Sequence, residues 1–323
     1  MLAWRTSALV MAAALAALAQ NKWTAPRTPW GDPDLEGVWN NSTITELERP
    51  AALSGKQVLA DSDIAALERK AAENRVDRAP SAGDPGTYNQ AWFDRGTKVV
   101  PTRRTSLIID PPDGKLPPLT AEGQKRQEER FKRLGPTATG SSGSGPFDSY
   151  EDISVVTRCI TRGLPNAMIP GAYNNNYQIV QTPGRVVIVS EMMHDVRVIP
   201  LDGRPHISAN IRQWMGDSVG HWEGNTLVVD VTNFPDRDVT GFGVGYRWSE
   251  TAHLHLIERF TRIDANTIDY QFTVDDPATF TRKWTASIPM VKSADPLYEY
   301  ACHEGNYGLE GILKASRAQD KTR

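Results

Sequence analysis

Closely spaced apolar segments in the second half of the chain constrain its fold more than any other feature. They are Val186–Ser190, Val196–Ile199, Leu227–Thr232, Leu254–Thr261, Thr267–Val274 and Thr279–Ile288. Gly, Asn, Asp and Pro separate most of them, and most of the connections are too short for a helix. Strands joined in this way pair as antiparallel neighbours in a meander. We therefore expect a mainly β fold that closes into a barrel or a sandwich.

The preceding part of the chain has a different texture, with short apolar runs among Pro and Gly clusters. One helix is expected over Ser62–Asn74, capped by Asp61, and a second from Thr120 to Leu134. The Ser- and Gly-rich stretch 137–145 reads as a flexible link. We expect residues 20–150 to form a loop-rich region with one or two helices that packs on a β domain of residues 151–323.

The first 19 residues have the pattern of a secretory signal peptide. Arg5 is followed by an uncharged apolar stretch and then by Ala17-Leu18-Ala19, a small-residue cleavage pattern. About a dozen apolar residues are too few to span roughly 30 Å of hydrocarbon. We expect a periplasmic or secreted protein without a membrane span.

The two cysteines, Cys159 and Cys302, both follow this segment. An even cysteine count in an oxidising compartment indicates a disulfide, and only one pairing is available. The alternative is two buried thiols.

The charge balance argues against polyanionic partners. The chain carries 36 basic and 39 acidic residues, for a net charge of −3. Such a surface offers no electrostatic attraction to nucleic acid, which depends on clustered positive charge.

Side-chain alternation places two charged residues on the apolar side of the expected sheet. Glu258 shares a face with Leu256 and Phe260, and Arg282 shares one with Phe280 and Trp284. Buried charges are costly unless they are paired, so the two either pair with each other or each meets a ligand or water. A ligand would then lie in a partly polar cavity, oriented by Arg282 and Glu258. Four aromatic residues would line this cavity: Tyr270, Phe272, Phe280 and Trp284. The alternative for these four residues is plain core packing. The alternative to a polar site is a structural ion pair, or side chains that reach solvent at the strand edge.

Histidines beside carboxylates supply candidates for acid–base chemistry. We single out His194, His221 and His303 together with Glu258. The pair His253-Leu254-His255 lies on one face of a strand, but the following Glu258 has the wrong spacing for a cupin-type metal site. No residue is therefore assigned as a metal ligand. Neither a Gly-x-Ser-x-Gly motif nor a phosphate- or dinucleotide-binding glycine pattern occurs, and the sequence indicates no particular cofactor.

Four segments carry a resemblance to a known family. They are Pro33–Trp39, Gly216–Val229 with the pattern GDSxGHWEGxTLVV, Leu256–Arg262, and Tyr298-Glu299-Tyr300-Ala301-Cys302-His303-Glu304-Gly305-Asn306-Tyr307. Together they resemble an uncharacterised family of secreted bacterial proteins, which implies export but no activity. Gly37-Val38-Trp39 is also similar to the Gly-x-Trp motif of lipocalins and related calycin barrels. That similarity implies a calycin-like barrel in which Trp39 closes one end and packs against an arginine.

These observations lead to two functional hypotheses. The first is an exported β-barrel that binds a small molecule in a partly polar cavity. The second is a periplasmic hydrolase, lyase or isomerase that uses the histidines and Glu258, with a metal only if ligands converge in space. A carbohydrate-binding module using Trp222 and Trp248 is a third, weaker possibility. The sequence does not decide whether the chain is an enzyme.

Overall fold

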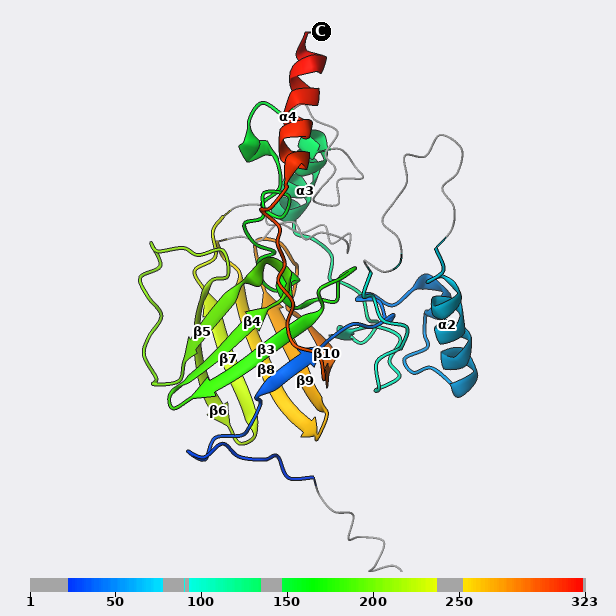
Figure 1. The fold of residues 1–323 in the computed structure, drawn as a ribbon, viewed down its shortest axis with the longest axis vertical. Coiled ribbons are helices and arrows are strands. Elements are labelled where there is room, and N and C mark those ends of the chain that lie inside the picture. The colour runs from blue at the N-terminus through cyan, green and yellow to red at the C-terminus, as the bar shows by residue number, and fades with distance from the viewer. Residues whose placement is uncertain (1–22, 78–89, 91–92, 135–146, 237–251, 322–323) are drawn as a thin grey trace, which may run out of the picture.

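The computed structural model describes residues 23–77, 90, 93–134, 147–236 and 252–321. The expected signal peptide and the Ser- and Gly-rich link lie outside these residues. Ten strands of the described chain join in one antiparallel sheet that nearly closes into a barrel (Figure 1). The strands are β1 (Gly37–Asn40), β2 (Ile108–Asp110), β3 (Asn176–Thr182), β4 (Arg185–Ser190), β5 (Val196–Pro200), β6 (Asp217–Glu223), β7 (Thr226–Thr232), β8 (His255–Asp264), β9 (Thr267–Asp275) and β10 (Trp284–Lys292).

The strand order combines two meanders. Strands β3, β4 and β5 are sequential neighbours, as are β6 to β10, and β1 lies between β3 and β10. β2 pairs with β10 off this path. The region 20–150 therefore contributes two strands to the sheet as well as packing on it. The mainly β, antiparallel fold expected from the sequence is confirmed.

The sheet path ends at β5 on one side and β6 on the other, and these two strands approach each other closely. A Cβ atom on Gly220 of β6 would lie 2.7 Å from the Ile199 side chain and 2.9 Å from that of Leu201. Only glycine leaves room for the neighbouring wall at this point. Side chains rather than a ladder of backbone hydrogen bonds thus fill the seam.

Alternating side chains fill the barrel interior. In β9, Ile268, Tyr270, Phe272 and Val274 are all buried, as the period-two pattern predicts. The aromatic rings contact one another, with Phe260 and Tyr270 at 4.7 Å between centroids and Phe272 and Trp284 at 5.4 Å. Edge and tilted packing of this kind stabilises a core beyond simple burial.

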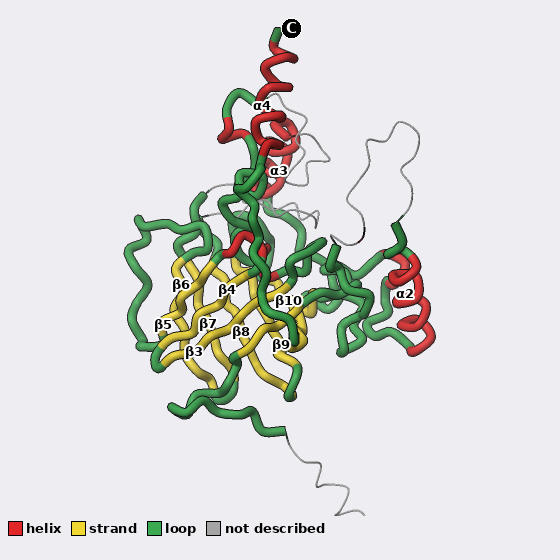
Figure 2. Tube along the Cα trace, in the orientation of Figure 1, coloured by secondary structure: helices red, strands yellow, loops and turns green. Residues whose placement is uncertain are grey.

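The helices lie outside the sheet (Figure 2). α2 (Asp61–Glu73) and α3 (Ala121–Leu134) confirm the two expected helices, although Ala60 rather than Asp61 precedes the first turn of α2. The helix α4 (Tyr307–Asp320) and short 3₁₀ turns, among them η5 (Met192–His194), complete the described helical structure. Helices α3 and α4 project from one end of the barrel, while α2 lies beside the wall.

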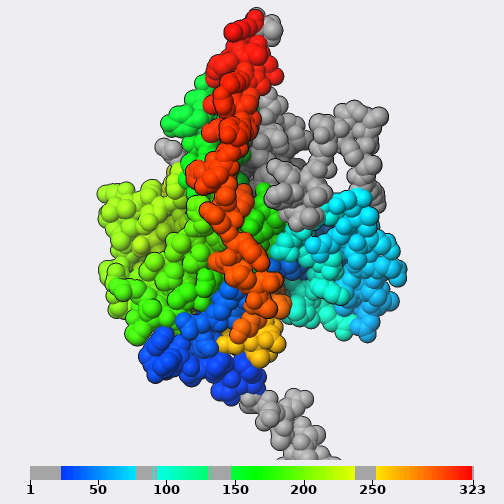
Figure 3. Space-filling model, viewed as in Figure 1, coloured from blue at the N-terminus to red at the C-terminus, as the bar shows by residue number. Residues whose placement is uncertain are grey.

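After β10 the chain runs along the outside of the barrel towards α4 (Figure 3). We call residues 293–306 the C-terminal strap. The disulfide between Cys159 and Cys302, with a Cα–Cα distance of 5.7 Å, fastens the strap to the end of the barrel. The expected cysteine pairing is confirmed, and it joins positions 143 residues apart.

The orientation expected for Arg282 is wrong. β10 begins only at Trp284, and residues 281 and 282 form a bend, so the alternation does not extend back to Arg282. Arg282 is exposed and donates from Nη2 to Asp110 Oδ1 at 2.9 Å. The inward positions of Trp284 and of Glu258 are confirmed.

Candidate functional site

A charged pair lies inside the barrel wall. Glu258 of β8 is fully buried, and its partner is Arg197 of β5 rather than Arg282. Arg197 Nη1 donates to Glu258 Oε1 at 3.1 Å, and Nη2 donates to Glu258 Oε2 and to Ser218 Oγ. The Tyr270 hydroxyl donates to Glu258 Oε1 at 2.8 Å. The pair therefore links β5 to β6 and β8 across the seam.

The electrostatics of this pair are those of a structural contact in which only Arg197 Nε lacks a hydrogen-bond partner. Burial by itself lowers the pKa of Arg197, but the adjacent Glu258 carboxylate outweighs it, so the net pKa of the guanidinium is raised. Burial, together with the Glu258 charge, holds the pKa of Tyr270 well above its usual value. Both groups keep their protons, and Glu258 has no oxygen left without a donor. A buried pair with this geometry needs no ligand to balance its charge.

A second buried arginine, at the end of the barrel, has no such partner. Arg162 is 1% exposed and lies in the coil between Cys159 and β3. Its Nε and Nη2 atoms donate to no acceptor in the described protein, and none of its nitrogens forms an ion pair with a described carboxylate. Its guanidinium lies against Gly171, where a Cβ would be 3.1 Å from Nη1. Burial lowers the pKa of Arg162.

Other buried polar atoms around Tyr177 also lack hydrogen-bond partners. The Tyr177 hydroxyl donates to the Ala167 carbonyl at 2.8 Å and accepts from Asn41 Nδ2 at 3.2 Å. Asn41 Oδ1 and Ser190 Oγ are buried without a hydrogen-bond partner, and Ser190 is the cross-strand neighbour of Tyr177. Burial raises the pKa of Tyr177 to about 12, so this phenol stays neutral. Buried polar groups normally have partners, and a gathering of unsatisfied ones calls for a ligand, an ion or water.

Three carboxyl groups surround this end of the barrel. Asp195 accepts from Thr161 Oγ1 at 2.9 Å and from the backbone N–H of Arg162. Glu191 accepts from Asn176 Nδ2 at 2.7 Å, and Asp94 accepts from an asparagine side chain. Burial raises the pKa of Asp195 and of Asp94. The local charge is therefore sensitive to proton uptake.

The C-terminal strap covers the same region. The Tyr298 N–H donates to Glu191 Oε1 at 3.3 Å, and the ring of Tyr300 stacks near that of Tyr173 at 6.3 Å between centroids. Farther along, Asn306 Nδ2 donates to the Thr157 carbonyl at 3.0 Å. The segment Tyr298–Asn306, which stood out in the sequence, thus encloses the surroundings of Arg162.

The turn after β4 has an unusual backbone. Met193 and His194 have φ values of 62° and 44°, in the left-handed region that non-glycine residues seldom occupy. The turn places His194 beside His303 of the strap, with ring centroids 6.4 Å apart. Backbone strain of this kind persists only where the surrounding structure enforces the conformation, and such residues are concentrated at functional sites.

The structure therefore brings together two of the four predicted catalytic residues, His194 and His303, both exposed at the disulfide end. The other two lie elsewhere. Glu258 is sealed inside the wall, and His221 of β6 is exposed beside Glu223, with Nε2 3.3 Å from Oε1. The predicted ligand-binding aromatics Tyr270, Phe272, Phe280 and Trp284 belong to the packed core, and a ligand role for them stays a prediction.

His255 belongs to a further cluster, on the outer wall. Its Nε2 lies 2.9 Å from Asp230 Oδ1, and Nε2 of His206 lies 3.0 Å from the same oxygen. Nδ1 of His206 lies 2.7 Å from Asp217 Oδ2. Within the described residues no three His, Cys, Asp or Glu side chains form a ready metal site. Two imidazoles therefore meet at one carboxylate oxygen in this cluster.

Trp39 has the surroundings that the Gly-x-Trp similarity implies. It is fully buried, its Nε1 donates to the Leu35 carbonyl at 2.9 Å, and the guanidinium of Arg262 lies 5.5 Å from its ring centroid. Membership of the calycin barrels stays a prediction. Trp222 is only partly exposed and packs against the core, while Trp248 lies outside the described residues.

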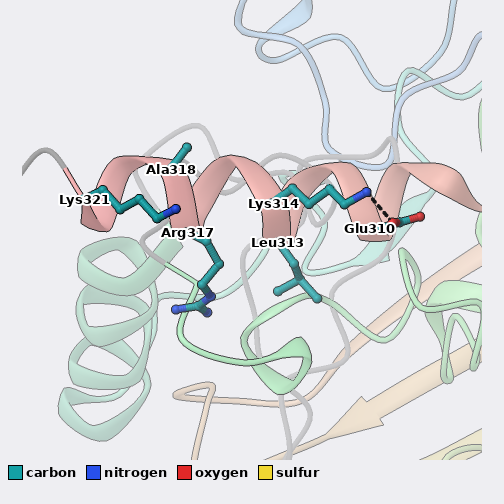
Figure 4. Close-up of a pocket in the computed structure, with 6 residues that line it drawn as sticks. All are labelled: Glu310, Leu313, Lys314, Arg317, Ala318 and Lys321. Atoms are coloured by element: carbon teal, nitrogen blue, oxygen red, sulfur yellow. Dashed lines mark ion pairs between the residues drawn. The ribbon is translucent and has the colours of Figure 1, made fainter.

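A shallow cavity of about 390 Å³ runs along α4 (Figure 4). It is lined by Glu310, Leu313, Lys314, Arg317, Ala318 and Lys321. Its charged groups are exposed, and Lys314 pairs with Glu310. It lacks the buried polar groups that orient a small ligand.

Sequence reasoning missed Arg197 and Arg162. The alternation in β5 gave the wrong signal for Arg197, because Val196 and Val198 on the opposite face are the exposed residues. The remaining signal was that a buried Glu258 requires a cationic partner. Arg162 follows no periodic pattern, and nothing in its local sequence distinguishes it from an exposed loop arginine.

No described helix is both long and apolar enough to cross a bilayer. Comparison with family models, curated proteins and solved structures found no match for this chain.

Proposed function

We propose that this chain is an exported protein that binds a small molecule at the disulfide end of its barrel. The site comprises Arg162, Tyr177 and Asn41, covered by Tyr173 and the C-terminal strap. The observation that carries the proposal is the gathering of buried polar atoms without partners at this end: Asn41 Oδ1, Ser190 Oγ, and Nε and Nη2 of Arg162. A few convergent polar groups among apolar neighbours are typical of small-ligand sites.

Export is supported by two features of the chain. The first 19 residues have the signal-peptide pattern. The Cys159–Cys302 disulfide is of a kind that persists in oxidising compartments. The mature protein would then begin near Gln20 and act in the periplasm or outside the cell. Mass spectrometry of exported protein tests this, and an intact Met1 would refute it.

Binding is tested by thermal denaturation of the mature, oxidised protein against a library of small polar metabolites. A ligand at 100 times its Kd stabilises the fold by about 2.7 kcal/mol, which shifts the melting temperature measurably. Amide chemical-shift changes on binding should map to the strap and the turn after β4. Changes confined to the outer wall, or no stabilising compound, would refute the proposal.

The outer-wall cluster favours an enzyme as a second candidate. An imidazole oriented by a carboxylate is the usual arrangement of a general base, and Asp230 lies against Nε2 of His255 in this way. The predicted hydrolase, lyase or isomerase activity would then use His255, with His206 on the same carboxylate oxygen. If Asp230→Asn leaves every activity found for the protein unchanged, this candidate fails.

A further inference from the structure

We infer that the group recognised by Arg162 is a carboxylate, so that the ligand of the proposed site is a small carboxylic acid in its ionised form. This inference rests on the proposed function and specifies its ligand class. It starts from the two nitrogens of Arg162 that lack acceptors, Nε and Nη2.

These two nitrogens form one edge of the guanidinium plane. Their N–H bonds point in the same direction, at a spacing that matches the two oxygens of a carboxylate. A Cβ on Gly171 would lie 3.1 Å from Nη1 and 3.5 Å from Nη2, so the absence of a side chain at this position leaves the guanidinium uncrowded there. The Nε–Nη2 edge, whose two nitrogens lack acceptors, is the one that would bind a carboxylate through two parallel hydrogen bonds.

The surrounding charge favours a monoanion over a phosphate ester. Among the described residues Arg162 forms no direct ion pair, although Asp195 lies close enough to act on its charge, and Glu191 lies at the same end of the barrel. One carboxylate neutralises one guanidinium. A phosphate monoester carries nearly two negative charges at neutral pH, which would leave an excess of negative charge beside two acidic residues.

The tyrosines define the route to the arginine. The phenol groups of Tyr173 and Tyr300 are near enough to Arg162 to act on its charge, and both residues are partly exposed. Tyr300 belongs to the strap, which is fixed on either side by the Tyr298–Glu191 hydrogen bond and the disulfide. The ligand reaches the guanidinium past this pair of rings, which then cover its remaining part.

Calorimetric titration of the mature, oxidised protein tests the inference with three monocarboxylates, acetate, benzoate and butyrate, and their neutral amides. At least one carboxylate should bind 10-fold or more tightly than its amide. Arg162→Gln should abolish this preference, and Arg162→Lys, which loses the paired hydrogen bonds, should weaken carboxylate binding about 10-fold. Arg104→Gln is the matched control, because Arg104 also has a buried Nε without an acceptor but donates from Nη2 to Ser287.

Crystals soaked in 4-bromobenzoate provide a test that needs no variant, since the bromine locates the bound acid. A carboxylate on the Nε–Nη2 edge of Arg162 supports the inference. A bromine elsewhere, equal affinity for acid and amide, tighter binding of phenyl phosphate than of benzoate, or no binding by any of the acids overturns it. Binding of the neutral amides at the disulfide end would leave the proposed function standing and remove only the ligand class.

Discussion

The barrel interior and the disulfide end each contain a buried arginine, and the two are treated in opposite ways. Arg197 donates to Glu258 and Ser218 within the wall, and only its Nε lacks an acceptor. Arg162 is equally inaccessible but leaves two nitrogens without acceptors and forms no ion pair with a described carboxylate. The interior contact closes the seam between β5 and β6, which the sheet itself does not pair. The contrast indicates that the first arginine serves the fold and the second serves a ligand.

The largest effect is expected for Arg197→Met. Removing the guanidinium leaves Glu258 charged, buried and without its main donor, which should lower the free energy of unfolding by about 3–5 kcal/mol. Urea denaturation measures this loss. Adding Glu258→Met should recover much of it, because the buried charge is then gone. A single variant as stable as the wild type would show that the pair does not hold the seam.

Removing the disulfide should cost slightly less. The chain-entropy estimate for a long loop gives about 2–5 kcal/mol for Cys159→Ser with Cys302→Ser. Because the bridge lies at the end of the barrel, the far-ultraviolet circular dichroism of the sheet should persist while the strap becomes sensitive to protease. Loss of the sheet signal together with the strap would mean that the two regions are not separable.

Arg162→Met should behave in the opposite way to Arg197→Met. It removes a buried charge that has no partner, so the stability of the ligand-free protein should stay the same or rise by about 1 kcal/mol. Urea denaturation beside Arg197→Met makes the comparison direct. A loss as large as that of Arg197→Met would show that Arg162 is a structural residue.

The smallest effect concerns Asp195. Burial raises its pKa in the folded protein above the ordinary value of 3.8. The folded state therefore binds the proton more tightly, and this contribution to stability is greatest below pH 3.8 and is lost as the pH rises through the folded pKa. Asp195→Asn should flatten the stability profile across that window. Unfolding free energies measured at intervals from pH 3 to pH 7 check this. The pKa of Asp94 is raised in the same direction, so Asp94→Asn tests whether Asp94 adds to the slope of the stability profile.

Periodicity predicted the barrel wall well and its end poorly. In β9 every second residue is apolar, so both the strand and its inward face could be predicted. β6 contains Gly220, His221 and Trp222, and this mixed pattern conceals a strand that only its neighbours define. The orientation predicted for Arg282 is wrong because no distinctive residue marks the bend before Trp284, and alternation carries no information past the end of a strand.

The candidate site was predictable only in outline. The sequence indicated His194 and His303 as candidates. Because His303 adjoins Cys302, the disulfide holds His303 at the end of the barrel, beside His194. Arg162 comes from a coil, and its burial results from contacts with β3, the turn after β4 and the strap. Such convergence depends on tertiary packing, which no local pattern encodes.

Strand β1 has a consequence for how the molecule assembles. Its residues pair with Tyr177 on one side and with Val291 and Lys292 on the other. β1, which lies between the two meanders, comes from the beginning of the polypeptide, whereas its neighbour β10 comes from near the end. A nascent chain therefore cannot join the two meanders while β10 is still inside the ribosome. Pairing over such sequence separation is slow. We expect refolding to be limited by this docking step, and co-translational folding to leave the β1–β3–β4–β5 part of the sheet unjoined to β10 until synthesis is almost complete.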